Sequence, residues 1–233
     1  MNFKRYESRF KAGEIMTDYI KEKNKDLYQE ILTNPNDTFC FAIPNGGVPV
    51  AESFCSILHI EYDLFIVRKI KIPYNPEAGF GSITTDGTVL INEVLLEHLS
   101  LTEEEINNAI EQTKNEINQR LDFYDKPNNL SSHYQQKIES KKVFLIDDGL
   151  ASGFTMLAAI NMVKKYNPTK IYISVPTAPH RTVENIEGKV EEIFCPNIRK
   201  VLRFAVADAY KNWYDLSEEE VLEIIRSSEY YSS

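Results

Sequence analysis

Two adjacent carboxylates, Asp147 and Asp148, follow an apolar run at residues 143–146 and precede a stretch of small residues. The run has the length and character of a buried strand, and helical spacing resumes at Gly153. Open α/β sheets bind ligands at the carboxyl ends of their parallel strands, so this strand-to-helix turn is a candidate binding site. The two side chains point to different faces unless the turn begins between them. They could accept hydrogen bonds from two vicinal hydroxyls, such as those of a ribose.

The loop after the acids has residue types that let the backbone approach an anion. Gly149, Ala151 and Gly153 carry little or no side chain, so nearby N–H groups can face a phosphate closely. The N-terminus of the following helix adds about 0.3–1 kcal/mol of favourable electrostatic energy. Ser152 and Thr155 add hydroxyl donors. A turn built in this way binds a phosphate dianion without any lysine.

An Asp-Asp-Gly sequence is by itself usually no more than a polar turn. The combination of an apolar strand, two acids, a small-residue loop with Gly and Thr, and a helix is much rarer, and it favours a binding function. A Walker A loop is excluded because no G-K-[ST] follows. The sequence also has no G-x-G-x-x-G for a dinucleotide.

The segments around this turn predict an α/β fold. A strand at 142–146, a helix at 153–166 and a strand at 170–175 form a unit with a right-handed crossover in a parallel sheet. We therefore expect a mostly parallel central sheet with helices packed on it. Further strands are predicted at 38–43, at 63–67 with its end on Arg68, and at 190–194.

The remaining pattern is mainly helical. An opening helix is predicted at 9–32, with Ile15, Tyr19, Leu27 and Ile31 roughly on one face. A second helix is predicted at 48–58, and capping boxes that start at Thr102 and Ser217 open two more. Asp86-Gly87 is typical of a hairpin turn, and residues 125–133 are interpreted as a polar linker.

The composition is that of an ordinary globular domain. The 233 residues are 42% apolar and 26% charged, which suffices for a core without disulfide or metal staples. Cys40, Cys55 and Cys195 lie far apart beside apolar runs, and we interpret them as buried thiols rather than as a catalytic or zinc-binding set. A net charge of −9 argues against a nucleic-acid partner. No apolar stretch is long enough to span a bilayer, so we expect a cytoplasmic protein without membrane contact.

Residues 143–156 resemble the ribose-phosphate-binding motif of type I phosphoribosyltransferases, which bind 5-phosphoribosyl 1-pyrophosphate (PRPP). Residues 42–51, 67–70 and 75–82 and the surroundings of Trp213 are similar to a branch of predicted phosphoribosyltransferases with a long central segment. The resemblance implies a three-layer α/β/α fold with a mostly parallel sheet and a hairpin and helical insertion. It implies a single domain over 1–233, with a hood loop and helical insertion at about 73–135 and a C-terminal segment at about 196–233.

The resemblance also assigns roles to individual residues. It implies that Asp147 and Asp148 hold the ribose hydroxyls and that Arg68 and Lys69 meet the pyrophosphate. The turn Asn45-Gly46-Gly47 would be the pyrophosphate loop, which in this family often contains a non-proline cis peptide. Because position 45 is not basic here, that loop would rely on backbone donors. The loop for the 5-phosphate would consist of Gly149, Ala151, Ser152, Gly153, Phe154 and Thr155.

The implied reaction transfers a phosphoribosyl group from Mg-PRPP to a nitrogen nucleophile and releases pyrophosphate. Mg²⁺ is the expected cofactor, carried by PRPP close to Asp147 and Asp148 rather than by a dedicated protein site. The partners expected are PRPP, an unidentified nucleobase-like acceptor and a second copy of the chain in a homodimer. Relatives that act on 6-oxopurines have an aspartate where this chain has Ala151, which argues against that subclass.

Several alternatives stay open at the level of the sequence. Residues 73–90 would form a mobile hood loop over PRPP, and Glu77 and Asp86 within it are candidate general bases or merely solvated carboxylates. The aromatic residues around 210–214 could stack on an acceptor or simply pack in the core. A non-catalytic PRPP- or nucleotide-binding regulator of the same fold is the main alternative function. A sugar-phosphate hydrolase is a third, but the sequence shows no second carboxylate cluster for a two-metal site.

Overall fold

The central sheet contains five parallel strands in the described part of the chain, in the order β2-β1-β6-β7-β9. The structure is a computed structural model that describes residues 4–126 and 130–232. Continuous apolar sequences form these strands because both faces of the sheet are covered. The strands are β1 (Thr38–Ala42), β2 (Tyr62–Leu64), β6 (Lys142–Ile146), β7 (Lys170–Ser174) and β9 (Glu192–Phe194).

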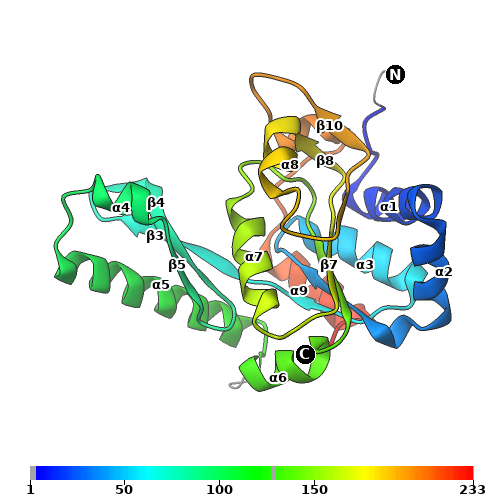
Figure 1. Cartoon of the computed structure of the whole chain (residues 1–233), viewed down its shortest axis with the longest axis horizontal. Coiled ribbons are helices and arrows are strands. Elements are labelled where there is room, and N and C mark those ends of the chain that lie inside the picture. The colour runs from blue at the N-terminus through cyan, green and yellow to red at the C-terminus, as the bar shows by residue number, and fades with distance from the viewer. Residues whose placement is uncertain (1–3, 127–129, 233) are drawn as a thin grey trace.

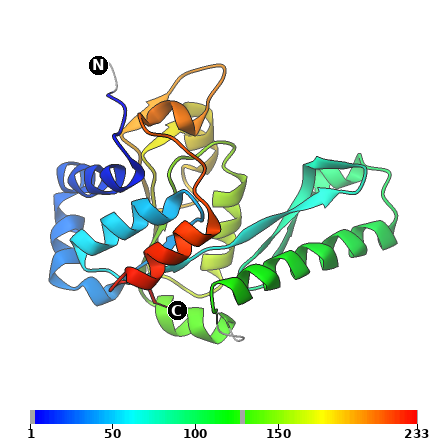
Figure 2. The same cartoon turned by 180° about the vertical axis from the view of Figure 1, so that it is seen from behind.

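Alternate residues of each strand enter two separate cores. Phe144 and Ile146 of β6 pack in the core under α1, α2, α3 and α9, whereas Val143 and Leu145 pack under α6 and α7. Figure 2 shows α3 and α9 in front of the sheet, with α7 behind it. The predicted three-layer α/β/α fold with a mostly parallel sheet is therefore confirmed. The covering helices are α1 (Arg9–Lys23), α2 (Lys25–Thr33), α3 (Gly47–Leu58), α6 (Leu130–Ile138), α7 (Phe154–Lys164) and α9 (Glu218–Ser227).

Aromatic contacts hold the strands and helices together. The ring of Phe144 stacks on that of Tyr172 with 4.9 Å between centroids, and Phe41 meets Tyr134 of α6 edge-on at 5.2 Å. Such pairs contribute about 0.5–1.5 kcal/mol beyond the burial of their area. Within the described residues, Cys40, Cys55 and Cys195 are buried free thiols, as the sequence predicts. None of the helices described is both long and apolar enough to cross a lipid bilayer.

The opening helix predicted at 9–32 is two helices, because the chain breaks at Asn24. This residue ends α1, and its side chain accepts a hydrogen bond from the Leu27 amide at the start of α2. Asn competes with helical backbone bonding in this way, so it favours caps over helix interiors. The predicted buried face is also partly wrong, because Met16 and Ile20 are fully buried while Ile15 and Tyr19 are only partly covered.

A long arm leaves the core after β2 and projects to the left in Figure 1. It is an antiparallel sheet packed on a helix, and the Asp86-Gly87 hairpin and the Thr102 capping box lie where the sequence predicts them. The prediction of a strand at 63–67 is wrong in its extent, because β2 ends at Leu64 and Arg68 belongs to the first strand of the arm. The arm consists of β3 (Val67–Ile72), β4 (Asn75–Thr84), β5 (Val89–Ile91), α4 (Glu93–Glu97) and α5 (Glu103–Phe123).

The segment predicted as a hood loop, 73–90, is therefore largely strand. Phe80 and Ile83 of β4 are fully buried and join the apolar core, which holds the hairpin in an extended, paired conformation. The polar linker predicted at 125–133 is also partly wrong, since α6 begins at Leu130 and packs its apolar face under the sheet. Residues 127–129 of that prediction lie outside the described residues.

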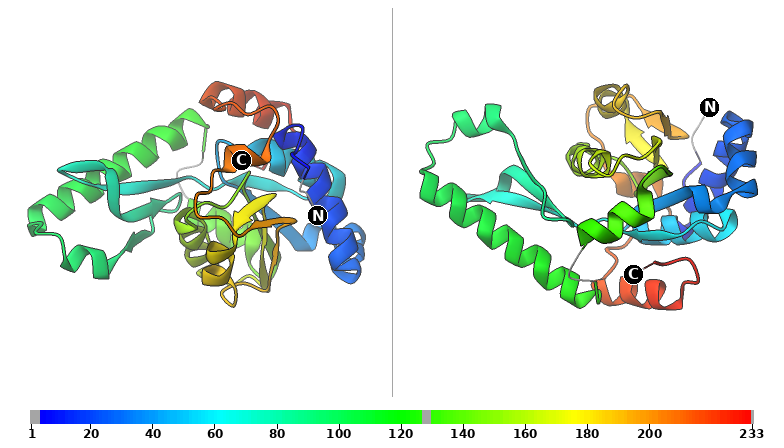
Figure 3. Two further views of the ribbon diagram at one scale, coloured as in Figure 1. Left: turned by 90° about the horizontal axis from the view of Figure 1, so that it is seen from above. Right: turned by 60° about the horizontal axis from the view of Figure 1, so that its bottom comes forward.

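A smaller layer lies above the carboxyl ends of the parallel strands (Figures 1 and 3). Strands β8 (Thr177–Pro179) and β10 (Asn197–Arg199) pair in parallel, and helix α8 (His180–Ile186) connects to β8 directly. Short 3-10 turns, η1 (Pro35–Asp37) and η2 (Val206–Ala209), complete the elements. The N-terminal segment meets the C-terminal one here, because the amide of Tyr6 donates to the carbonyl of Ala209 at 2.8 Å.

A buried ion pair joins the end of the arm to the core, and it yields a stability prediction. The ammonium of Lys126 and the carboxylate of Asp63 contact each other with no solvent exposure of either side chain. Replacing Lys126 with Met leaves the buried Asp63 carboxylate without its ammonium partner and with only His133 Nε2 nearby, at 3.6 Å. We therefore expect a loss of about 3–5 kcal/mol in the free energy of unfolding, measured by urea denaturation. Lys170→Met removes the exposed pair with Glu191 and is expected to cost less than about 1 kcal/mol. Equal losses in the two variants would contradict the assignment.

Candidate functional site

Asp147 and Asp148 lie just beyond β6, which ends at Ile146. Because the turn begins before the pair, the two acids do not alternate across the sheet. The amide of Asp148 donates to Asp147 Oδ1 at 2.8 Å. Desolvation raises the pKa of Asp147 well above its usual range, and the adjacent charge of Asp148 adds to the effect. The strand end therefore holds two interacting carboxyl groups where ionisation of both is costly.

Arg9 is the cation that this pair faces. Its Nε lies 2.7 Å from Asp148 Oδ2, and the Arg9 side chain is only 7% exposed. Burial raises the pKa of Asp148, and the hydrogen bond and charge of Arg9 oppose that rise. Arg9 comes from the first turn of α1, at the opposite end of the sequence from most of the site. It was not among the site residues predicted from the sequence.

Aromatic residues of the C-terminal segment hold Arg9. Its guanidinium carbon lies 4.1 Å from the ring centroid of Trp213 and 5.8 Å from those of Tyr210 and Tyr214. Arg9 Nη1 also donates to the carbonyl of Tyr214 at 2.9 Å. Tyr210 is buried and donates its hydroxyl to the carbonyl of Asp148, whereas Trp213 and Tyr214 keep 37% and 52% of their surface exposed. The cluster thus packs around the cation, and its outer rings face solvent.

The loop Asn45-Gly46-Gly47 lies directly against the two acids. A Cβ atom on Gly46 would lie 1.9 Å from Asp148 Oδ2, and one on Gly47 would lie 2.9 Å from the Cα of Asp147. The peptide bond between Pro44 and Asn45 is cis. The structure therefore brings the predicted pyrophosphate loop and the predicted ribose-binding acids together, at a distance that only glycine permits.

The side chain of Asn45 is engaged on the far side of this loop. Its Nδ2 donates to the carbonyl of Leu216 at 2.8 Å, and its Oδ1 accepts from Arg120 Nη2 at 3.0 Å. Arg120 belongs to α5 of the arm and also contacts Glu218 at the start of α9. The arm and the C-terminal helix therefore meet at the loop. Arg120 is a second basic residue that the sequence analysis missed.

The predicted phosphate-binding turn has its amides available. Ala151 and Ser152 are exposed, and within the described residues the amides of Ala151, Ser152, Gly153 and Thr155 donate to no protein acceptor. The amide of Phe154 has only a 3.4 Å contact with the hydroxyl of Ser152. These groups are the unsatisfied donors at the start of α7. They can therefore converge on an anion.

Gly153 permits the turn into α7. Its φ of 83° is in the left-handed region, and a Cβ there would lie 2.7 Å from the Thr182 side chain. The hydroxyl of Thr182 donates to the carbonyl of Ala151 at 2.8 Å. On the other side, the Leu150 amide donates to the carbonyl of Thr177 at 2.9 Å. Helix α8 and strand β8 thus support the turn from behind.

Arg68 and Lys69 reach the same turn from the base of the arm. They line a cavity of about 420 Å³ together with Phe154 and Thr155 at the start of α7. The hydroxyl of Ser82, which pairs with Lys69 across β3 and β4, is buried in the wall and has no hydrogen-bond partner among the described residues. An unsatisfied buried hydroxyl is costly without a ligand or water. Ser82 is therefore a third candidate residue that the sequence analysis did not single out.

One acid lies among these cations. Glu116 of α5 lines the same cavity, and Lys71 pairs with it at 3.0 Å. Lys71 therefore neutralises Glu116, and with Arg68 and Lys69 the lining side chains carry a net positive charge. Together with the amides of the turn, this charge suits a multiply charged small anion.

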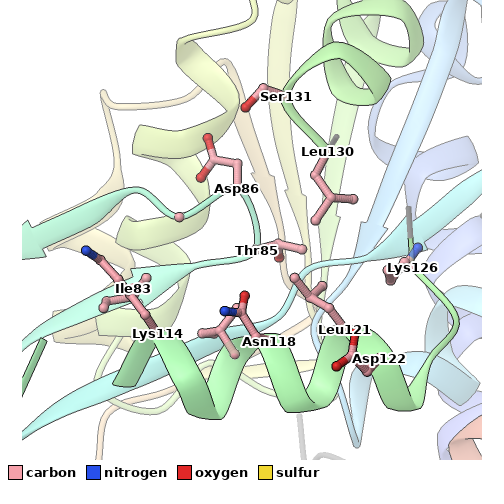
Figure 4. A pocket seen from close by; sticks show the side chains of 12 residues that line it. Ile83, Thr85, Asp86, Lys114, Asn118, Leu121, Asp122, Lys126, Leu130 and Ser131 are labelled. Atoms are coloured by element: carbon pink, nitrogen blue, oxygen red, sulfur yellow. The ribbon is translucent and has the colours of Figure 1, made fainter. Parts of the chain in front are cut away.

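A larger cavity of about 510 Å³ lies apart from the turn, between the β4–β5 hairpin, α5 and α6 (Figure 4). Asp86 at its rim accepts hydrogen bonds from Thr84, Thr88 and Tyr166. Burial alone would raise the pKa of Asp86, but these hydrogen bonds lower it on balance. Asp86 is therefore engaged in the hairpin and tied to the far end of α7. The side chain of Glu77, the other candidate base, lies outside the described residues.

Magnesium fits this site only as a partner of a bound phosphate ligand. Among the described residues, no group of three or more His, Cys, Asp or Glu side chains could hold a metal ion. Mg²⁺ is commonly held by one or two carboxylates together with substrate phosphates and waters. The adjacent Asp147 and Asp148 carboxyl groups match that mode.

Each missed basic residue occupies a buried helical face. In α1 the buried positions are Arg9, Ala12, Gly13, Met16, Thr17 and Ile20, which have helical spacing with the arginine in the first turn. In α5, Arg120 lies three residues after the buried Ile117. A cation on an apolar stripe costs free energy unless it is paired, so such a position is a signal for a buried partner. A cation on an apolar helical face can therefore be recognised in the sequence, but the residue with which it pairs cannot.

The fold and the site together define a parallel α/β protein with a turn of unpaired amides beside an acidic pair. The family model for the phosphoribosyl transferase domain matches residues 8–209. The chain belongs to this family.

Individual relatives agree with this assignment. Proteins from two strains of Mycobacterium tuberculosis, provisionally named phosphoribosyl transferases, are 27% identical over 180 residues, or 77% of this chain. The chain spans 39% of the length of these relatives. The crystal structure of TT1426 from Thermus thermophilus has the same fold, with a TM-score of 0.70 at 22% identity over 95% of this chain and 97% of that one.

The contact between Arg120 and Asn45 gives a second prediction. Arg120→Met leaves the buried side of Asn45 Oδ1 without a donor, so we expect the free energy of unfolding to fall by about 1–3 kcal/mol in urea denaturation. The matched control is Arg226→Met in α9, which removes an exposed pair with Asp125 and should change stability by less than about 1 kcal/mol. An Arg120 variant as stable as the control would mean that the arm is not anchored at the loop.

Proposed function

We propose that the protein transfers the 5-phosphoribosyl group of Mg-PRPP to a nitrogen nucleophile and releases pyrophosphate. The observation that carries the proposal is the set of unpaired amides of Ala151, Ser152, Gly153 and Thr155, which follows the half-buried Asp147 and the buried Asp148. A phosphate on these amides would place its ribose next to the acids. The family to which the chain belongs supports group transfer of this kind.

In this proposal each group of residues has a separate task. The amides of the turn and the hydroxyls of Ser152 and Thr155 bind the 5-phosphate, and the two acids accept hydrogen bonds from the ribose hydroxyls. The loop 45–47 offers backbone donors to the pyrophosphate. Arg68 and Lys69 would add positive charge for the pyrophosphate from the base of the arm. Their cavity is lined by Phe154 and Thr155 of the phosphate turn and not by the loop 45–47, so these cations would lie between the two phosphate sites.

In this proposal the protein promotes the reaction mainly by stabilising the charges that develop as the bond breaks. When the bond at the anomeric carbon breaks, the sugar becomes oxocarbenium-like and the departing pyrophosphate gains negative charge. Preorganised cations and amides stabilise that charge at little reorganisation cost. Mg²⁺, bound to the pyrophosphate oxygens, would add positive charge at the same place. The acceptor would approach the anomeric carbon from the side opposite the departing pyrophosphate.

A PRPP-binding regulator of the same fold is the second candidate. It is favoured by the engagement of the described arm carboxylates near the cavities, because Asp86 is hydrogen-bonded within the hairpin and Glu116 is paired with Lys71. The binding site would be the same in both cases. The two functions differ only in turnover.

Pyrophosphate release distinguishes these candidates. We expect the protein to release pyrophosphate from PRPP with magnesium when the correct acceptor from a panel of nucleobases and small amines is present. The product would be the corresponding ribosyl 5-phosphate, identified by mass spectrometry. Saturable PRPP binding in calorimetry without turnover on any acceptor would favour the regulator. No binding of PRPP at all would exclude both.

The basic pair can be tested separately from the phosphate turn. Arg68→Gln removes one charge from the cavity, so we expect pyrophosphate to bind at least about tenfold more weakly in titration calorimetry, since a hydrogen bond to a charged group is worth about 1.5–3 kcal/mol. Binding of ribose 5-phosphate should change less than about threefold. Arg181→Gln, an exposed change on α8, serves as the control. Equal losses for both ligands would place Arg68 elsewhere.

A further inference from the structure

The N- and C-terminal segments form a clamp beside the acidic pair. The Lys211 amide donates to the carbonyl of Tyr6 at 2.8 Å, and the Tyr6 hydroxyl donates to the carbonyl of Pro176 at 2.8 Å. The Tyr210 hydroxyl donates to the carbonyl of Asp148 at 2.7 Å. These contacts fix the start of α1 against the end of β6, although the two segments are distant in the sequence.

Arg9 connects this clamp to a candidate substrate-binding side chain. Its guanidinium is engaged on two edges and one face: Nε bonds Asp148, Nη1 bonds the carbonyl of Tyr214, and the flat face lies on Trp213. A planar guanidinium stacked on an aromatic ring is held in one orientation, which a lysine ammonium would not be. The Arg9–Asp148 contact is therefore a rigid one.

The consequence concerns the orientation of Asp148. Its side chain is only 12% exposed, and the contact with Arg9 fixes one of its two carboxylate oxygens. Only the ionised carboxylate is purely an acceptor, with about four lone-pair sites on its two oxygens. Arg9 uses one site on Oδ2. Further lone pairs therefore remain on the ionised group.

We propose that Arg9 is a positioning residue of the active site, which fixes the orientation of the Asp148 carboxylate so that its remaining oxygen lone pairs can accept hydrogen bonds from the ribose diol. The inference rests on the proposed function. It adds that ribose recognition depends on contacts between the two ends of the chain, through Trp213 and Tyr214, and not only on the turn that contains Asp148.

The test measures discrimination between a ribose and a deoxyribose. Ribose 5-phosphate and 2-deoxyribose 5-phosphate differ by one hydroxyl, and titration calorimetry on the wild-type protein should give a preference for ribose of at least about tenfold. In Arg9→Gln we expect this ratio to fall to within about threefold of unity, while the affinity for 2-deoxyribose 5-phosphate changes little. Arg9→Lys retains the charge but not the stacking, so it should keep an intermediate ratio.

Two further variants keep the test decisive. Lys11→Gln, on the same helix and in an exposed pair with Glu14, should leave the ratio unchanged. If Arg9→Gln does not fold, Trp213→Leu is the alternative variant. It removes the partly exposed aromatic ring on which the Arg9 guanidinium lies, and it should lower the ratio as well.

Three results with the Arg9 variant would each overturn the inference: equal losses for both sugars, an unchanged ratio, or tighter ribose binding. A wild-type protein that binds PRPP but shows no ribose preference would also overturn it and would leave the proposed function standing. A wild-type protein that binds neither PRPP nor the sugar phosphates would exclude both.

Discussion

The Asp147–Asp148 pair lies where the chain leaves the central strand β6, in a place largely closed to solvent. Two adjacent carboxyl groups in such a place repel each other and lose hydration, so at least one needs a cation or a proton. Arg9 supplies the cation, and it is itself buried against Trp213. The positions of α1 and of the C-terminal segment are thus tied to the charge balance at one strand end. A rearrangement that separated these segments from β6 would remove Arg9 from Asp148.

The loop after β1 and the turn into α7 both depend on glycine residues for their close backbone packing. Gly46 allows the loop after β1 to touch Asp148, and Gly153 allows the turn into α7 to pass Thr182. A Cβ atom at either position would lie closer than contact distance to its neighbour, so both approaches require glycine. The unpaired donors at 151–155 result from this geometry together with the start of a helix. Because these backbone amides have no acceptor within the protein, an anion bound at the start of α7 would be a favourable partner.

The arm adds a distant element to this site. Arg68 and Lys69 lie on its first strand, beside the start of α7, and Arg120 lies near the end of its helix, where it bonds Asn45. Both ends of the arm therefore contact candidate substrate-binding segments, while its tip projects far from the core (Figure 3). The buried Asp63–Lys126 pair secures the junction at which the arm returns. A displacement of the arm would act on the basic pair and on the loop 45–47 together.

The sequence by itself determined the local elements and the turn. Strand β6, the hairpin at Asp86-Gly87 and the capping boxes at Thr102 and Ser217 are encoded by spacing within a few residues. Only the tertiary structure decided which cation meets Asp148, because Arg9 is 139 positions away and nothing near it specifies a partner. The same holds for Arg120 and Asn45, which are 75 positions apart. Such contacts depend on how whole amphipathic faces pack against the sheet, and the pattern of one segment carries no information about the segment that covers it.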